Sequence, residues 1–172
     1  MIITVTAGPE ARQGLLRWNG LEVRCALGRS GIAARKQEGD GVTPVGSFPL
    51  RRALYRPDRG DPPETALPVA PIGPEDGWCD DPADPSYNRP VTLPFQASHE
   101  RMWRDDRLYD IVVVLGHNDD PPVPGLGSAI FLHVAREDHG PTEGCVALAP
   151  DDLRRLLADC RPGDAMEIRL PA

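Results

Sequence analysis

The sequence lacks three features that would each have assigned it to a broad class. It has no apolar run close to the roughly 20 residues that a membrane-spanning helix needs. It has no excess of positive charge, because 19 Lys and Arg residues face 26 Asp and Glu residues and the net charge is −7. Its first residues, Met1 to Thr6, show neither the basic start nor the apolar segment of a secretory signal. We therefore expect a soluble, folded chain without a membrane span, and no nucleic acid among its partners.

Paired cysteine motifs are also missing. The sequence contains no C-x-x-C pair among its four cysteines, which are Cys25, Cys79, Cys145 and Cys160. Their spacing therefore gives no support to a zinc ribbon. An even number would allow two disulfides in an oxidising compartment, whereas in a reducing one these residues would mostly be small buried hydrophobes. The sequence leaves that choice open.

Proline and glycine, by contrast, are abundant. The chain has 20 Pro and 17 Gly among 172 residues, which excludes a helical bundle or a coiled coil. A chain of this length can bury a core of its own, and no internal repeat is visible. We expect one mainly β domain over residues 1–172, with one clear C-terminal helix and one or two short helices.

Local patterns place the main elements. Asn19-Gly20 lies between two alternating runs and predicts a β-hairpin, with Cys25 pointing into the core. Further strands are expected at about 47–55, 108–116, 129–134 and 165–170. A helix should begin near Pro150 with a buried stripe of Leu153, Leu156, Leu157 and Cys160, and Ser98 should cap a short helix through Trp103. Residues 56–94 read as a long Pro-, Gly- and Asp-rich loop that its aromatic residues keep ordered.

The residues that can carry chemistry lie between two of these strands. His133 is at the end of a predicted strand, and Cys145 follows Gly144 at the end of the next loop. A strand, a loop and a returning strand can bring the thiol beside the imidazole, which would take its proton for nucleophilic attack and return it to the leaving amine. Gly144, which has no Cβ, can expose backbone N–H groups to an oxyanion. The pattern favours acyl transfer.

Two ordered motifs make this interpretation specific. The first motif is Phe131-Leu132-His133, followed by Pro141-Thr142-Glu143-Gly144-Cys145-Val146-Ala147-Leu148. It resembles the active-site signature of the YkuD-type L,D-transpeptidase catalytic domain, in which a His precedes a [Ser/Thr]-x-Gly-Cys-[Val/Ile] segment. The family's Thr-Pro-x-Gly-x-Phe segment resembles Thr43-Pro44-Val45-Gly46-Ser47-Phe48. The segments Gly77–Pro82 and Tyr87–Pro90 also resemble a shorter, single-domain subgroup of that family.

The resemblance implies a sandwich- or barrel-like β fold that acts on the stem peptides of peptidoglycan, as donor and as acceptor. Cys145 would be the nucleophile, His133 the base and later the acid, and Gly144 part of the oxyanion hole, with Thr142 shaping the loop. The product would be a 3-3 or 1-3 cross-link with release of a D-amino acid. Neither a metal nor another cofactor is implied. A monomer in the periplasm or cell envelope is expected, although no signal peptide is visible.

Other residues could line the substrate site, and each also has a structural interpretation. These are His139 in the loop before Cys145, His117 and Asn118 after the central strand, and Trp78 and Tyr87, which could form a lid wall or anchor the long loop.

The chain also departs from the family pattern at two positions. Val134 stands where many members have Gly or Ser, and Ala147 stands where many have Arg. If that Arg holds a substrate carboxylate, another group must do so here.

Other functions remain open. The same site could serve an L,D-carboxypeptidase or D-amino-acid exchange. A zinc hydrolase would use His117, His133, His139 and Cys145, although this spacing is not a common zinc pattern. The chain could also be a non-catalytic wall-binding module with an inert Cys145. A sortase-like enzyme would call for an Arg on a following strand, and no such pattern stands out.

Overall fold

The computed structural model describes residues 1–171, which form fourteen strands and one helix. In chain order the elements are β1 (Ile2–Thr6), β2 (Gln13–Trp18), β3 (Leu21–Ala26), β4 (Ile32–Ala33), β5 (Thr43–Pro44), β6 (Gly46–Tyr55), β7 (Val69–Pro71), β8 (Asp76–Cys79), β9 (Pro90–Thr92), β10 (His99–Arg101), β11 (Ile111–Leu115), β12 (Phe131–Val134), β13 (Val146–Leu148), α1 (Pro150–Asp159) and β14 (Ala165–Arg169). The predicted mainly β class is confirmed.

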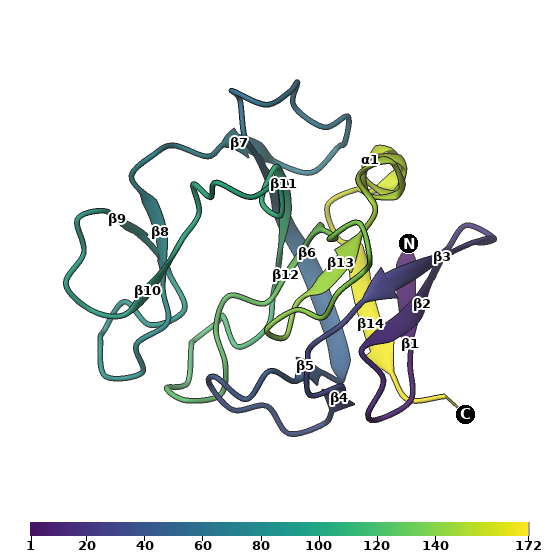
Figure 1. Ribbon diagram of the computed structural model, residues 1–172, viewed down its shortest axis with the longest axis horizontal. Helices are drawn as coiled ribbons and strands as arrows, with labels where there is room; N and C mark the ends of the chain where they lie inside the picture. The colour runs from purple at the N-terminus through teal and green to yellow at the C-terminus, as the bar shows by residue number, and fades with distance from the viewer. Residues whose placement is uncertain (172) are drawn as a thin grey trace.

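One sheet dominates the fold. Its nine strands run in the order β11-β12-β13-β3-β2-β1-β14-β6-β7, and β6 also pairs with β11 (Figure 1). Because the long strand β6 contacts both β14 and β11, the sheet closes on itself into a barrel-like form. Most neighbours are antiparallel, but three pairs are parallel, namely β1 with β14, β6 with β7, and β12 with β13. The loop between β12 and β13 therefore crosses from one end of the barrel to the other, and the predicted site residues lie at its two ends.

The hairpin predicted from Asn19-Gly20 is confirmed. Strands β2 and β3 pair in register from Gln13 with Ala26 to Trp18 with Leu21. Asn19 and Gly20 have φ angles of 44° and 78°, the left-handed conformation that a two-residue turn of this kind requires at both positions.

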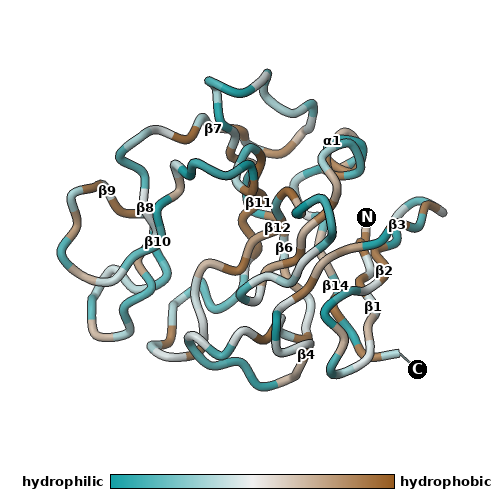
Figure 2. Tube along the Cα trace, in the orientation of Figure 1, coloured by the Kyte–Doolittle hydropathy of each residue, from teal (hydrophilic) through white to brown (hydrophobic). Residues whose placement is uncertain are grey.

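The main core fills the interior of the barrel and continues under α1. It contains the inward side chains of the strands together with Leu153, Leu156, Leu157 and Cys160, so the predicted helical stripe is confirmed. Figure 2 shows hydrophobic colour along the barrel strands and hydrophilic colour along the outer loops. All four cysteines are free and buried, and Cys25 points into this core as expected. Within residues 1–171 no helix is long and apolar enough to cross a membrane.

A small second sheet lies beside the barrel, with strand order β10-β8-β9 (Figure 1). Two of its strands, β8 and β9, lie within residues 56–94, the segment predicted as a long loop. The short helix predicted from Ser98 to Trp103 is wrong, because residues His99–Arg101 form β10 and pair with Gly77–Cys79 of β8. The backbone N–H and C=O groups that a helix would have satisfied locally are satisfied here by a distant strand. Across residues 1–171, α1 is therefore the single helix.

Candidate active site

Cys145 and His133 lie on the same face of the parallel pair β12 and β13. The register pairs Leu132 with Val146 and His133 with Ala147, which places Cys145 level with Phe131. Side chains alternate between the two faces of a sheet, and paired residues share a face. Leu132 and Val146 accordingly point into the barrel core, whereas Phe131 and Cys145 belong to a second apolar cluster beneath the small sheet. The thiol and the imidazole are thus diagonal neighbours that face the small sheet.

The thiol of Cys145 is held among backbone groups. Its Sγ donates to the carbonyl of Ala129 at 3.3 Å and accepts from the N–H of Phe131 at 3.3 Å. Only 7% of the residue is exposed. Burial raises the pKa of the thiol to about 12 and nearby Glu100 adds to the rise, while the Phe131 N–H and Lys36 oppose it by less. The resting side chain is therefore a thiol and not a thiolate.

The imidazole of His133 has a fixed tautomer. Its Nδ1 lies 2.8 Å from the carbonyl oxygen of Val134, which can only accept, so Nδ1 carries the proton and Nε2 is free to take one. The Val134 carbonyl therefore orients the imidazole. Tyr109 packs edge-on against the ring at 5.4 Å between centroids. Burial lowers the pKa of the imidazole to about 4, although the Val134 carbonyl opposes this. Both members of the pair are neutral at rest.

Two threonines hold the loop before Cys145 in place. Thr142 Oγ1 donates to the Cys145 carbonyl at 2.7 Å and accepts from the Gly144 N–H at 3.1 Å. Thr43, the first residue of the Thr-Pro motif, donates to the same carbonyl at 3.3 Å. Gly144 has φ +130°, and a Cβ there would lie 2.8 Å from the Val42 carbonyl oxygen. The position therefore requires glycine, and its N–H is directed to Thr142 in the resting structure.

A pocket of about 830 Å³ opens over the pair. Cys145, His133 and Thr142 line it. Charged side chains of both signs share its wall: Lys36, Arg101, Arg104, Arg136, Glu38, Asp80, Glu100, Asp105, Asp106 and Glu143. A ligand that carries both ammonium and carboxylate groups would find partners for each.

The other proposed binding residues lie outside this lining. His117 and Asn118 shape the loop that follows β11, where the His117 Nε2 lies 3.0 Å from the Leu126 carbonyl and the Asn118 amide donates to Val123 and Gly127. His139 contacts Arg24, at 3.4 Å between side-chain nitrogens.

Trp78 and Tyr87 anchor the long loop in the core. Trp78 donates to Asn88 at 3.0 Å and packs edge-on against Phe131, and the Tyr87 hydroxyl donates to Glu38. Of the two interpretations of these aromatic residues, the structure supports anchoring.

Sequence reasoning missed several residues of the pocket. Glu100 and Tyr109 line the same pocket as the pair, and the Tyr109 hydroxyl donates to the Glu100 carboxylate. Burial raises the pKa of Glu100. Arg104 lies over the Tyr109 ring at 5.1 Å and pairs with Asp106 at 2.6 Å. The only sequence signal at Glu100 and Trp103 suggested a helix, so nothing in the local pattern indicated that this segment would form a wall of the site.

The alternative set of zinc ligands is not assembled. In residues 1–171 the structure brings no three His, Cys, Asp or Glu side chains into an arrangement that could hold a metal ion. His117 and His139 serve other loops, so the set of His117, His133, His139 and Cys145 does not converge.

Comparisons with solved structures find similar folds at low identity. The helical cell shape determining protein Pgp2 of Campylobacter jejuni matches with TM-score 0.46 and 15% identity, over 99% of this chain and 48% of that one. L,D-transpeptidase 1 of Mycobacterium tuberculosis matches with TM-score 0.40 and 15% identity, over 99% and 62%. An L,D-transpeptidase of Mycobacterium smegmatis matches with TM-score 0.41 and 13% identity, over 97% and 58%. The chain thus spans about half to three fifths of these structures.

The family itself is shown by a match over most of the chain. No curated protein sequence matches it significantly. The family model of the YkuD L,D-transpeptidase catalytic domain, however, matches residues 9–168, a span that includes the Thr-Pro motif, β12, the Gly-Cys segment and α1. The chain belongs to the YkuD family of L,D-transpeptidase catalytic domains.

Proposed function

We propose that this protein is a peptidoglycan L,D-transpeptidase that works through an acyl-enzyme on Cys145. The observation that carries the proposal is the placement of Cys145 and His133 on one face of a parallel strand pair, lining one pocket, with the imidazole Nε2 free to accept a proton. Family membership supports the substrate class, which is the stem peptide of peptidoglycan.

The proposed reaction has two halves. As Sγ attacks the carbonyl carbon of an L-residue in the donor stem, its proton passes to His133 Nε2 and the carbonyl becomes an oxyanion. The C–N bond then breaks, the imidazolium protonates the leaving amine of the D-amino acid, and a thioester remains. In the second half, an acceptor amine gives a proton to His133 and attacks the thioester. The new amide forms, and the thiolate takes the proton back.

The neutral resting pair fits this sequence of steps. With the thiol pKa raised and the imidazole pKa lowered, no ion pair is stored in the free enzyme. Proton transfer is therefore expected only when a carbonyl is in place, because the negative charge then passes from sulfur to the oxyanion and the imidazolium gives its proton to the leaving amine. This limits reaction of the free thiol with other electrophiles.

The mixed charge of the pocket supports a zwitterionic peptide as the ligand. Stem peptides carry carboxylates and an amine, and Arg104 and Arg136 are cations in the lining that could hold a carboxylate in place of the family Arg missing at Ala147. Glu100 and Asp80 lie on the same wall and could receive an ammonium group. Because the substrate is cell-wall material, we propose that the protein acts in the cell envelope.

The test is incubation with purified disaccharide-tetrapeptides, followed by mass spectrometry of the products. Matched proteins are Cys145→Ala, His133→Gln and, as a control, Cys160→Ala, which removes a buried thiol at the end of α1 outside the pocket. We expect cross-linked dimers from the wild type and Cys160→Ala, and none from the two site variants. Fragmentation of the dimers assigns the linkage as 3-3 or 1-3. Release of D-alanine without dimers would instead support a carboxypeptidase, and no product of either kind would contradict the proposal.

A further inference from the structure

Lys36 is a nearly buried cation in the wall of the pocket. Its side chain is only 5% exposed. A Cβ at Gly127 would lie 2.8 Å from the Lys36 Cγ, so the absence of a side chain there makes room for the aliphatic stem. At the other end, Nζ lies 3.4 Å from the position that a Gly144 Cβ would occupy. The ammonium group therefore sits beside the residue that precedes the nucleophile.

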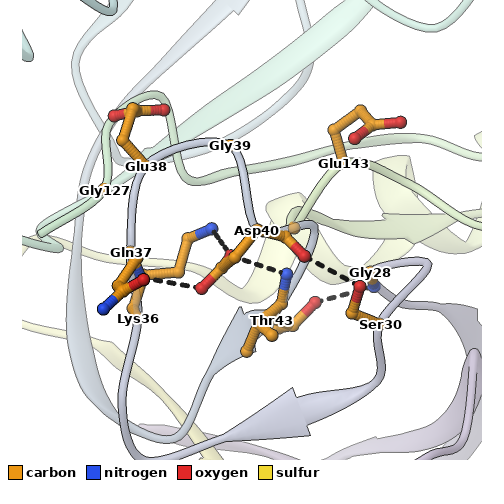
Figure 3. A network of polar contacts seen from close by, with 12 residues as sticks. Gly28, Ser30, Lys36, Gln37, Glu38, Gly39, Asp40, Thr43, Gly127 and Glu143 are labelled. Carbon is orange, nitrogen blue, oxygen red and sulfur yellow. Dashed lines mark hydrogen bonds and ion pairs between the residues drawn. The ribbon is translucent and has the colours of Figure 1, made fainter. Parts of the chain in front are cut away.

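A short network holds this ammonium in place. Lys36 Nζ donates to the Asp40 carboxylate, which also accepts the backbone N–H groups of Gln37 at 2.7 Å and Val42 at 2.9 Å (Figure 3). Burial alone would raise the pKa of Asp40, but the hydrogen bond from Lys36 and these N–H groups outweigh it and lower the pKa. An ammonium has three donors, and Asp40 takes one of them. The other two N–H groups of the ammonium belong to Lys36, a residue that lines the pocket.

The reaction needs a positive group beside Gly144 and Cys145. Attack on a carbonyl creates negative charge on the oxyanion beside Gly144 and Cys145, and the Gly144 N–H is already given to Thr142 at 3.1 Å. The small sheet also brings Glu100, an acid, into the pocket wall. A fixed cation beside Gly144 would offset both disadvantages, because charge interactions are stronger in a site from which water is largely excluded.

We propose that Lys36 stabilises the negative charge that develops at Gly144 and Cys145, on the thiolate as it forms and on the oxyanion of the tetrahedral intermediate. The inference deepens the proposed function and rests on it. Lys36 stays protonated throughout, since the proton of Sγ goes to His133 Nε2. It acts as an electrostatic partner of the nucleophile, and the Asp40 carboxylate fixes its position.

The charges around Cys145 and Lys36 decide the direction in which the pH profile of the thiol reaction should shift. Cys145 faces the cations Lys36 and Arg104, the acid Glu100, and two groups that are neutral near pH 7, His133 and Tyr109. Loss of Lys36 leaves Glu100 opposed by Arg104 alone. Reaction of the thiol should then move to higher pH.

The charged groups around Lys36 identify Asp40→Asn as the second variant. Lys36 pairs with Asp40, lies near His117 and shares the pocket lining with Glu38. Asp40 is the direct partner of the ammonium, so removing its charge leaves the cation less compensated. Reaction of the thiol should then move to lower pH, or stay unchanged.

The experiment measures the rate of alkylation of Cys145 by iodoacetamide against pH, by peptide mass spectrometry, in four proteins. Lys36→Met should slow alkylation about tenfold or more at a given pH, since an opposite charge within a few ångströms changes a pKa by one unit or more. Lys36→Arg should restore most of the rate. Asp40→Asn breaks the same ion pair but keeps the cation, so its rate should equal or exceed that of the wild type.

The Asp40→Asn protein separates an electrostatic role from a merely structural one. If Lys36 only pins the loop, Lys36→Met and Asp40→Asn will change the profile in the same direction, and that result would overturn the inference, as would an unchanged profile in Lys36→Met. Should Lys36→Met fail to fold by circular dichroism, slower alkylation in Asp40→Asn still overturns it. The product assay keeps the two proposals apart: no product from the wild type defeats the proposed function, whereas dimers from the wild type with an unchanged Lys36→Met profile defeat the role of Lys36 alone.

Discussion

Lowering the pH should destabilise the folded protein through one buried imidazole, that of His133. Burial lowers its pKa to about 4 from the ordinary 6.5. In the unfolded chain the imidazole takes up a proton near pH 6.5, whereas in the folded chain it does so only near pH 4. Between these values the unfolded state binds more protons, so stability is complete above about pH 6.5 and is lost progressively as the pH falls toward 4.

The magnitude follows from the size of the shift. One pKa unit corresponds to about 1.4 kcal/mol, so a displacement from 6.5 to about 4 amounts to about 3 kcal/mol of unfolding free energy. This is a large fraction of the roughly 5–15 kcal/mol that stabilises a typical domain. The residue is only 5% exposed, so solvent screening does not reduce the effect much.

The assay is urea denaturation followed by tryptophan fluorescence at about pH 7.5 and about pH 4.5. Between these two pH values the unfolding free energy of the wild type should fall by about 2 to 3 kcal/mol more than that of His133→Gln, which cannot take up the proton. Cys145→Ala is the matched control, because its thiol, with a pKa raised to about 12, does not titrate in this range. The unfolding free energy of Cys145→Ala should depend on pH as that of the wild type does, although its activity is lost. Parallel pH dependences in the wild type and His133→Gln would refute the reasoning.

The remaining predictions concern the loop before Cys145 and the pH dependence of the proposed reaction. Gly144→Ala should lower the unfolding free energy by about 1–3 kcal/mol in urea denaturation and abolish product, because its Cβ would lie 2.8 Å from the Val42 carbonyl at φ +130°; wild-type stability would contradict the clash. Thr142→Val should cost about 1–3 kcal/mol in the same assay and reduce kcat more than it raises KM, since it removes the bonds to Gly144 and Cys145; an unchanged kcat would show that the loop needs no pin. Because the pKa of Cys145 is raised to about 12 and that of His133 is lowered to about 4, kcat/KM should be flat from about pH 6 to about pH 9, and a bell centred near neutral pH would indicate an ion pair in the free enzyme.

The main strands of the barrel and the helix could be predicted because their signals are local. The Asn19-Gly20 turn, the apolar run of β11 and the leucine stripe of α1 each depend on residues close together in sequence. His133 and Cys145 are also close in sequence, and the register of the parallel strands β12 and β13 sets the two side chains diagonally beside each other.

The walls of the pocket could not be predicted in this way. The segment from Ser98 has a helix cap and good helix formers, yet pairing with β8 makes it a strand, and only that distant contact brings Glu100 over the thiol. Lys36 carries no motif either, because its position beside Gly144 results from the packing of its loop against Gly127 and from its bond to Asp40. Non-local pairing decides both positions.

Intact-protein mass spectrometry after brief mixing with the tetrapeptide donor, without acceptor, tests the central claim most directly. The wild type should gain the mass of the donor less its terminal D-amino acid, and peptide mapping should locate the addition on Cys145. Cys145→Ala should gain nothing, and a further addition of amine acceptor should discharge the wild-type adduct. A product formed at the normal rate by Cys145→Ala, or an adduct on another residue, would contradict the account.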